Sequence, residues 1–76
     1  MSKPIEPVYR MLGGRIEHIR TVLGWTQAEL AKKVGLTRTS IVNIEAGRQR
    51  ILLHDIERLA PAFQMTPKQL LRGIWT

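Results

Sequence analysis

The chain has 76 residues, of which 12 are lysine or arginine and 6 are aspartate or glutamate, so its formal net charge is +6. A chain of this length is expected to form one domain, and the absence of cysteine excludes disulfides, thiolate metal sites and thiol nucleophiles. No apolar run approaches the roughly 20 residues of a membrane span. The excess of basic residues favours an anionic partner, either nucleic acid or an acidic membrane surface.

The N-terminal segment is the first element in the chain. Pro4 and Pro7 indicate an extended arm, which we assign to residues 1–10, ahead of one domain over residues 11–76. Pro7 also suits the first position of a helix. The segment has no apolar signal-peptide core, so we expect the protein to stay in the cytoplasm.

A first helix is predicted over about residues 12–23. Gly13 and Gly14 interrupt its pattern, and each costs up to about 1 kcal/mol relative to alanine, so the prediction does not include a helical turn ahead of them. Gly24 ends the helix at the position where helices favour glycine. The apolar residues that show helical spacing are Val8, Leu12, Ile16, Ile19 and Leu23.

A second helix is predicted over about residues 27–34, and a capping box marks its start. The hydroxyl of Thr26 is expected to accept from the backbone of Glu29, whose carboxylate reaches back to the threonine backbone. Gly35 follows the helix and is expected to take a positive φ, which only glycine adopts without penalty.

A third helix is predicted over about residues 38–45, with Thr37 as its N-cap and Ala46-Gly47 as its end. Polar or charged residues fill most positions between the apolar ones in this part of the chain. The apolar residues expected to form the seam between the second and third helices are Leu30, Val34, Leu36, Ile41 and Ile44.

Two further helices are predicted in the C-terminal part. The fourth covers about residues 53–63, although Pro61 should kink it or end it early. The fifth covers about residues 67–73 and starts with a second capping box, Thr66 with Gln69. No segment alternates with a period of two, so the predicted fold class is all-α, a bundle of five short helices without strands. The inward positions of the fourth helix are Leu53, Ile56, Leu59, Ala60 and Phe63.

Residues 27–46 have the pattern of two short helices joined by a tight turn, which is typical of the helix-turn-helix motif. Ala31 is small because the third helix is expected to cross close above it. Trp25 is expected to pack at a helix junction, whereas Lys32 and Lys33 are expected to face solvent away from the groove.

The stretch TQAELAKKVGLTRTSIVNIEAGRQR, residues 26–50, resembles the lambda-repressor-like helix-turn-helix family of the Cro, phage-repressor or XRE type. The resemblance begins near Leu12 and ends near Leu71, and it implies a compact five-helix DNA-binding domain. The residues that agree with the spacing of the family are Gln27, Ala31, Gly35, Ile41, Ile44, Glu45 and Gly47.

The resemblance makes the third helix a recognition helix, whose first residues read base edges. Helical geometry supports the same surface independently, because it lies opposite the inward-pointing Ile41 and Ile44. An arginine at its edge suits guanine O6 and N7, an asparagine suits adenine or a phosphate, and a threonine or valine suits a thymine methyl group. The expected base-contacting residues are Arg38, Thr39, Val42 and Asn43.

The resemblance also implies phosphate contacts around the recognition helix. The second helix of the family opens with a glutamine whose side chain and backbone hold a DNA phosphate, and here that residue is Gln27; a helix start suits this contact because its free backbone N–H groups and the helix dipole favour anions. The loop after the third helix is similar to a second phosphate clamp of the family. Arg20 and Glu45 stand where the family often has a buried ion pair that joins the first and third helices. The expected phosphate-contacting residues are Gln27, Thr37, Ser40, Arg48 and Arg50.

Some apolar residues exceed what a five-helix domain has room to bury, and exposed apolar clusters usually mark an interface. Ile51 and Leu52 stand where the family commonly has proline and a helix-capping serine or aspartate. We therefore expect a homodimer, with Trp75 folded back onto the fifth helix as the alternative. The expected dimer-interface residues are Ile51, Leu52, Ile74 and Trp75.

The leading hypothesis is a homodimeric, sequence-specific regulator of transcription that binds a palindromic double-stranded DNA operator on the nucleoid. A phage repressor, a restriction-modification controller and an antitoxin that represses its own operon all fit, with polymerase or a toxin as a further partner. The alternative is an antitoxin or interaction module whose main role is to cover a partner protein.

Other classes of function are not expected. Ser2 and Ser40 are the only serines and neither has an evident base, so an enzyme is not predicted. His18 and His54 have no acidic or cysteine partners at ligand spacing, so neither a metal nor another cofactor is predicted. A membrane role is disfavoured because the basic residues do not line one face of an amphipathic helix.

Overall fold

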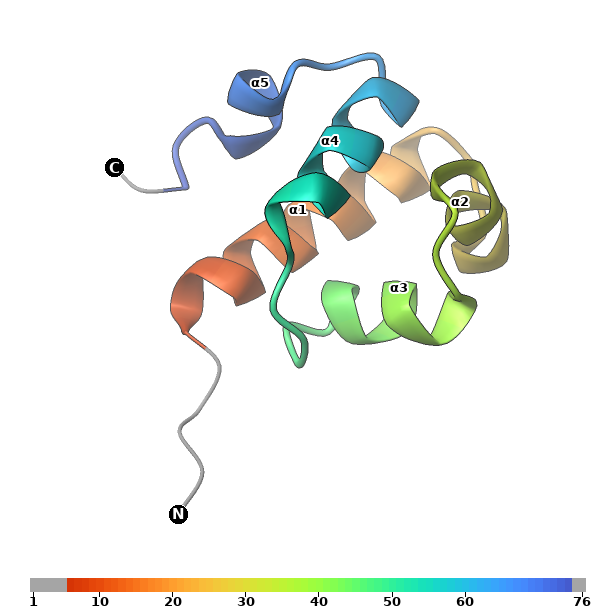
Figure 1. The fold of residues 1–76 in the computed structure, drawn as a ribbon, viewed down its shortest axis with the longest axis horizontal. Coiled ribbons are helices and arrows are strands. Elements are labelled where there is room, and N and C mark those ends of the chain that lie inside the picture. The colour runs from red at the N-terminus through yellow and green to blue at the C-terminus, as the bar shows by residue number, and fades with distance from the viewer. Residues whose placement is uncertain (1–5, 75–76) are drawn as a thin grey trace.

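The computed structural model describes residues 6–74 and contains all the helices predicted from the sequence (Figure 1). In chain order they are α1 (Pro7–Val22), α2 (Gln27–Val34), α3 (Arg38–Glu45), α4 (Leu53–Ala62) and α5 (Pro67–Leu71). α2 packs against α3, α1 packs across α3, and α4 contacts both α2 and α5. The described residues contain no strand, and the predicted all-α class is confirmed.

α1 begins earlier than expected, with Pro7 in its first turn. It continues through Gly13, which lies so close to α3 that a Cβ there would overlap the backbone carbonyl oxygen of Ile44. The predicted start was wrong because the local penalty of glycine is outweighed by the close packing that its missing side chain permits. Residues 7–10 therefore belong to α1 rather than to an extended arm. Residues 1–5 lie outside the described residues, and the division of the chain into arm and domain stays a prediction.

The bounds of α2 and α3 agree with those predicted, because both helices begin at threonine caps. The Oγ1 atom of Thr26 accepts from the backbone N–H of Glu29 at 3.0 Å, and the Glu29 carboxylate accepts from the Thr26 N–H at 2.8 Å. At the start of α3, Thr37 Oγ1 accepts from the N–H of Ser40 at 3.0 Å. Gly35, between the two helices, has a φ of +72°, so the predicted left-handed turn is confirmed.

The start and end of α4 depend on different groups. Its N-cap residue is Leu52, which has no polar side chain, and the carboxylate of Asp55 accepts from the Leu52 N–H at 3.1 Å. At the other end Pro61 lies in the last turn, and the helix stops at Ala62, one residue earlier than predicted. Gln64 then takes a φ of +58° and turns the chain away toward α5.

α5 ends at Leu71, two residues short of the predicted range of 67–73. Arg72 is already in an extended conformation, with ψ of 129°. The guanidinium of Arg15, from α1, donates to the backbone oxygen of Leu70 at 2.9 Å and also to that of Arg72. These contacts satisfy carbonyl groups that the end of a helix leaves without partners. No helix among the described residues is long and apolar enough to cross a membrane.

A contiguous cluster of apolar side chains from all of these helices forms the core. One predicted member is not part of it: Leu53 is 77% exposed. As the first residue of α4 it stands at the edge of the packed helices, where it lines an open groove. The largest fully buried side chains are Ile16, Leu30, Ile41, Ile44, Leu59 and Leu70.

Two residues assigned to a dimer interface are buried within the monomer. Ile51 is 8% exposed and Ile74 is 5% exposed, and both pack in the core. The expectation that a five-helix domain has little room for them was therefore wrong, because the segments after α3 and α5 each place an isoleucine in the core. Leu52 is 56% exposed, as expected, and Trp75 lies outside the described residues. The dimer surface itself stays a prediction.

Candidate nucleic-acid interface

The turn between α2 and α3 holds the two helices at a fixed angle. Ala31 is buried, and its carbonyl oxygen accepts from the N–H groups of both Gly35 and Leu36. A small residue in α2 and a left-handed residue at its end let α3 cross close to α2. The shared seam includes Leu30 and Ile41, both without solvent exposure. The pair of helices is therefore a preorganised unit.

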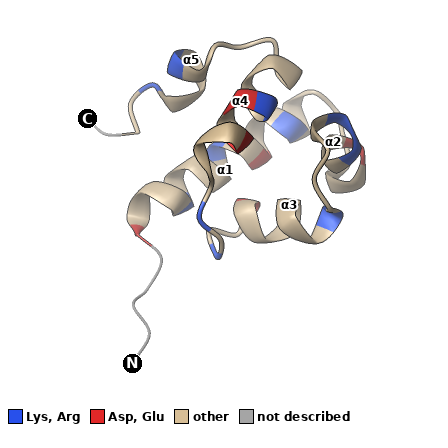
Figure 2. Cartoon of the chain, viewed as in Figure 1, with Lys and Arg blue, Asp and Glu red and all other residues tan. Residues whose placement is uncertain are grey.

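The outer face of α3 carries the side chains predicted to read bases. Arg38 and Thr39 are exposed at the start of the helix, and Val42 and Asn43 are partly exposed one turn later. Basic residues lie at both ends of α3, at its start and in the loop that follows it (Figure 2). The structure thus brings the four predicted base-contacting residues onto one surface that basic side chains flank.

The two arginines predicted to hold phosphates lie in the loop after α3, and both have partners within the chain. The Nε atom of Arg48 donates to Asn43 Oδ1 at 3.4 Å. The guanidinium of Arg50 lies 3.4 Å from a carboxylate oxygen of Glu6, the residue directly before α1. The first contact orients a predicted base reader, and the second brings an acidic residue to the predicted phosphate clamp. Neither contact is predicted by the sequence pattern.

The start of α2 differs in part from the prediction. The Nε2 atom of Gln27 donates to the Oε1 atom of Glu45 at 3.0 Å, so this side chain is bonded to α3. The helix start still has backbone N–H groups without partners in the helix, which is the feature that favours an anion. Gln27 thus supports α3 through its side chain, a role the sequence analysis did not include.

The predicted ion pair between α1 and α3 is present. The guanidinium of Arg20 donates to both carboxylate oxygens of Glu45, at 2.6 and 3.0 Å. It also donates to the backbone oxygen of Trp25 at 2.7 Å. The hydrogen bonds that Arg20 donates to Glu45 raise the pKa of Arg20 above its ordinary value, against the opposing effect of burial. Arg20 is 9% exposed and Glu45 only 7%, so the ion pair is largely withdrawn from solvent.

The loop after α3 rests on the first half of α1. Gly47, in this loop, has a φ of +74°, and a Cβ there would lie 2.7 Å from Cγ and 3.0 Å from Cα of Arg10. The position therefore requires glycine both for its backbone conformation and for its space. The spacing of the family identified this glycine, but only the structure shows that α1 supports the loop of the predicted phosphate clamp.

The segment before α2 packs against the end of α4 through two aromatic residues. The rings of Trp25 and Phe63 are stacked with centroids 6.0 Å apart, which confirms the predicted packing role of Trp25. Lys33 is exposed as predicted, and its ammonium group also lies 4.6 Å from the centroid of the indole ring. The described residues contain no cluster of three or more histidine, aspartate or glutamate side chains that could hold a metal ion.

The sequence and the helix arrangement of this chain are both similar to those of known proteins. Residues 16–70 match the sequence profile of the helix-turn-helix family. The chain therefore belongs to this family, and to its lambda-repressor-like, XRE-type branch.

Three relatives illustrate the similarity. A hypothetical transcription factor from Neisseria meningitidis serogroup B (strain ATCC BAA-335 / MC58) is 44% identical over 48 residues, which are 63% of this chain and 45% of the relative. The restriction-modification controller protein C.AhdI from Aeromonas hydrophila is 32% identical with a TM-score of 0.76, covering 83% of this chain and 94% of that one. SinR, a master regulator for biofilm formation solved in complex with DNA, is 27% identical with a TM-score of 0.74, covering 80% and 98%. The chain spans less than half of the Neisseria relative.

Proposed function

We propose that this chain is a transcriptional regulator that binds a specific double-stranded DNA operator as a homodimer. The outer face of α3, flanked by arginines and held by a buried ion pair, carries this proposal. The face has the size and chemistry that the major groove accepts. The similarity to SinR, which is described in complex with DNA, supports it. A regulator of this kind acts on the chromosome in the cytoplasm.

The base contacts come from the exposed face of α3. Arg38 donates to O6 and N7 of a guanine, and Thr39 and Val42 contact thymine methyl groups or neighbouring base edges. Asn43 accepts from Arg48 within the chain, so its amide N–H groups are the ones presented to an acceptor in the groove. Specificity in this proposal depends on a small set of side chains that the fold holds in place.

The phosphate contacts lie on both sides of α3. Arg48 and Arg50 bind one strand from the loop after the helix, and the hydroxyl groups of Thr37 and Ser40 donate to phosphates at its start. Gln27 contributes a backbone N–H of the α2 N-terminus, since its side chain is bonded to Glu45. Contacts of this kind set affinity and register but do not read sequence.

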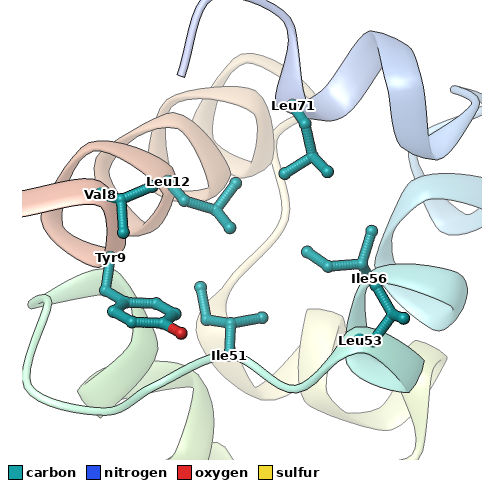
Figure 3. A pocket seen from close by; sticks show the side chains of 7 residues that line it. All are labelled: Val8, Tyr9, Leu12, Ile51, Leu53, Ile56 and Leu71. Carbon is teal, nitrogen blue, oxygen red and sulfur yellow. The ribbon is translucent and has the colours of Figure 1, made fainter. Parts of the chain in front are cut away.

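The homodimer forms at the edge of the bundle where α4 begins. An apolar groove of about 300 Å³ lies there between α1, α4 and α5, with Tyr9 and Leu53 on opposite sides (Figure 3). Leu52 and Leu53, next to each other at the start of α4, are 56% and 77% exposed. A two-fold contact through this edge places the two recognition helices in successive major grooves about 34 Å apart.

Selection of bound sequences from random duplex DNA tests the proposed function. We expect an enriched site made of two inverted half-sites whose centres lie about one helical turn apart. An enriched single half-site would contradict the dimer but not the DNA reading. No enrichment over the starting pool would contradict the proposed function.

The apolar groove also favours a second candidate, an interaction module of the antitoxin type that covers a partner protein. The groove is open and could accept an apolar segment of such a partner as well as a second copy of the chain. Purification of the chain with the products of its neighbouring genes tests the interaction module, because a toxin bound in a fixed ratio would support it.

For the leading proposal, similarity to C.AhdI favours a restriction-modification controller over a phage repressor or an autoregulating antitoxin.

A further inference from the structure

The first turn of α1 and the loop after α3 are in direct contact, although some 40 residues separate them. Gly47 lies against Arg10 with no room for a side chain, which fixes the loop on the helix. Next to this contact, Arg50 Nη2 lies 3.4 Å from Glu6 Oε1. The proposed phosphate clamp thus has a carboxylate beside it that belongs to the same molecule.

Both partners of this ion pair are accessible from solvent. The side chain of Arg50 is 61% exposed and that of Glu6 is 51% exposed. Hydrogen bonding to its own backbone and the nearby Arg50 lower the pKa of Glu6 below the ordinary value, so the carboxylate is charged at neutral pH. A DNA phosphate that approached Arg50 would therefore meet a guanidinium that already has an anionic partner.

We propose that Glu6 is an intramolecular competitor of the DNA phosphate at Arg50 and so lowers the affinity of the protein for all DNA. This inference rests on the proposed function. A phosphate and a carboxylate both accept hydrogen bonds from guanidinium N–H groups, so a phosphate that takes the Nη2 donor of Arg50 must displace Glu6 from it. Once displaced, the Glu6 carboxylate stays close to the phosphate and repels it.

The competition acts on affinity and not on base preference. The base readers of α3 have no contact with Glu6, whereas Arg50 is in the loop that contacts the backbone. Removing the carboxylate should therefore strengthen binding equally for the operator and for unrelated duplexes. Exposed ion pairs are weak, so we expect an increase in affinity of about two- to fivefold at physiological salt.

The test compares Glu6→Gln with Glu17→Gln. Both replace one exposed glutamate of the α1 region, but Glu17 lies 11 residues further along the chain, about 16 Å along the helix. This distance exceeds the screening length of about 8 Å at physiological salt, so Glu17→Gln should leave affinity nearly unchanged. Fluorescence anisotropy with the selected operator and with a scrambled duplex gives the dissociation constants, and melting curves show that each variant is folded.

The double variant completes the design. Arg50→Gln should weaken binding, and Glu6→Gln should bring a clearly smaller gain in the Arg50→Gln background than in the unchanged chain, because only the repulsion between the carboxylate and the phosphate is then left to remove. Equal affinity of Glu6→Gln and the unchanged chain would overturn the inference and leave the proposed function intact, as would an equal gain from Glu17→Gln. Failure of the unchanged chain to bind any DNA would instead overturn the proposed function, and this inference with it.

Discussion

The α2–α3 unit and the groove edge where α4 begins are stabilised in different ways. α2 and α3 begin at threonine caps, and charged hydrogen bonds to Arg20 hold the end of α3 on α1. The groove edge has a single polar contact of this kind, from the Leu52 N–H to the Asp55 carboxylate, and Leu53, the first residue of α4, is 77% exposed.

This difference corresponds to two tasks. A surface that reads base edges must hold its side chains within a fraction of an ångström, which polar caps and a buried ion pair provide. A surface that associates with another chain needs exposed apolar area, which the groove edge offers. We therefore expect variants of the first region to change folding stability or DNA specificity, and variants of the second to change association.

The largest effect is expected when the buried ion pair is broken. Glu45→Ala leaves the Arg20 guanidinium buried without its carboxylate, so the free energy of unfolding should fall by about 3–5 kcal/mol. Urea denaturation followed by circular dichroism measures the loss. Glu57→Ala, on the exposed face of α4, is the control and should change stability by no more than about 0.5 kcal/mol. Similar losses for the two variants would show that the pair does not stabilise the unit.

The next largest change in stability is expected at Gly13, and it should be opposite in sign to the change at its neighbour Gly14. Gly13→Ala should destabilise the protein by about 1–3 kcal/mol, because the methyl group would overlap the α3 backbone. Gly14→Ala should stabilise it by up to about 1 kcal/mol, because that position has no neighbour within 4 Å and alanine favours helix. Thermal melting of both variants measures the difference. Effects of the same sign would contradict the close α1–α3 packing.

Arg38→Ala tests base reading by the outer face of α3. We expect a loss of about 1–3 kcal/mol in binding free energy at the selected operator and relaxed preference at one base position of each half-site. Arg50→Ala is the control: it should weaken all duplexes alike and reduce the slope of log affinity against log salt concentration by about 0.9. If Arg38→Ala also weakened all sequences equally, Arg38 would be a phosphate contact instead.

The smallest effect is expected at the groove edge. Leu53→Asp should weaken the homodimer by about 1 kcal/mol, roughly fivefold, and leave the stability of the monomer nearly unchanged because the side chain is exposed. Val22→Asp is a matched control, since Val22 is 71% exposed at the end of α1 and does not line the groove. Sedimentation equilibrium measures both. An unchanged dimer in Leu53→Asp would exclude this edge as the interface.

The sequence predicted best those elements whose ends depend on nearby residues. Thr26, Gly35 and Thr37 act within a few positions of themselves, so the bounds of α2 and α3 could be read from local chemistry. The start of α1 could not, because it depends on the contact of Gly13 with a residue that lies 31 positions away in the chain. The low helix preference of glycine alone therefore predicted the wrong start for α1.

In the candidate site, too, features that depend on nearby residues could be predicted, and contacts between distant segments could not. Helical spacing and the family resemblance together predicted the four base readers, and the resemblance predicted the Arg20–Glu45 pair. The contacts of Gln27 with Glu45 and of Glu6 with Arg50 join segments far apart in the chain and have no sequence signal of their own. The burial of Ile51 was missed for a similar reason, since it depends on how the loop after α3 folds over the groove.

Methylation interference on the selected operator tests most directly whether α3 lies in the major groove. Dimethyl sulfate modifies guanine N7 in the major groove and adenine N3 in the minor groove. We predict that N7 methylation of one guanine in each half-site blocks binding, and that this block is lost in Arg38→Ala. Interference at adenine N3 alone, or the same guanine pattern in both proteins, would contradict base reading by Arg38 on the outer face of α3.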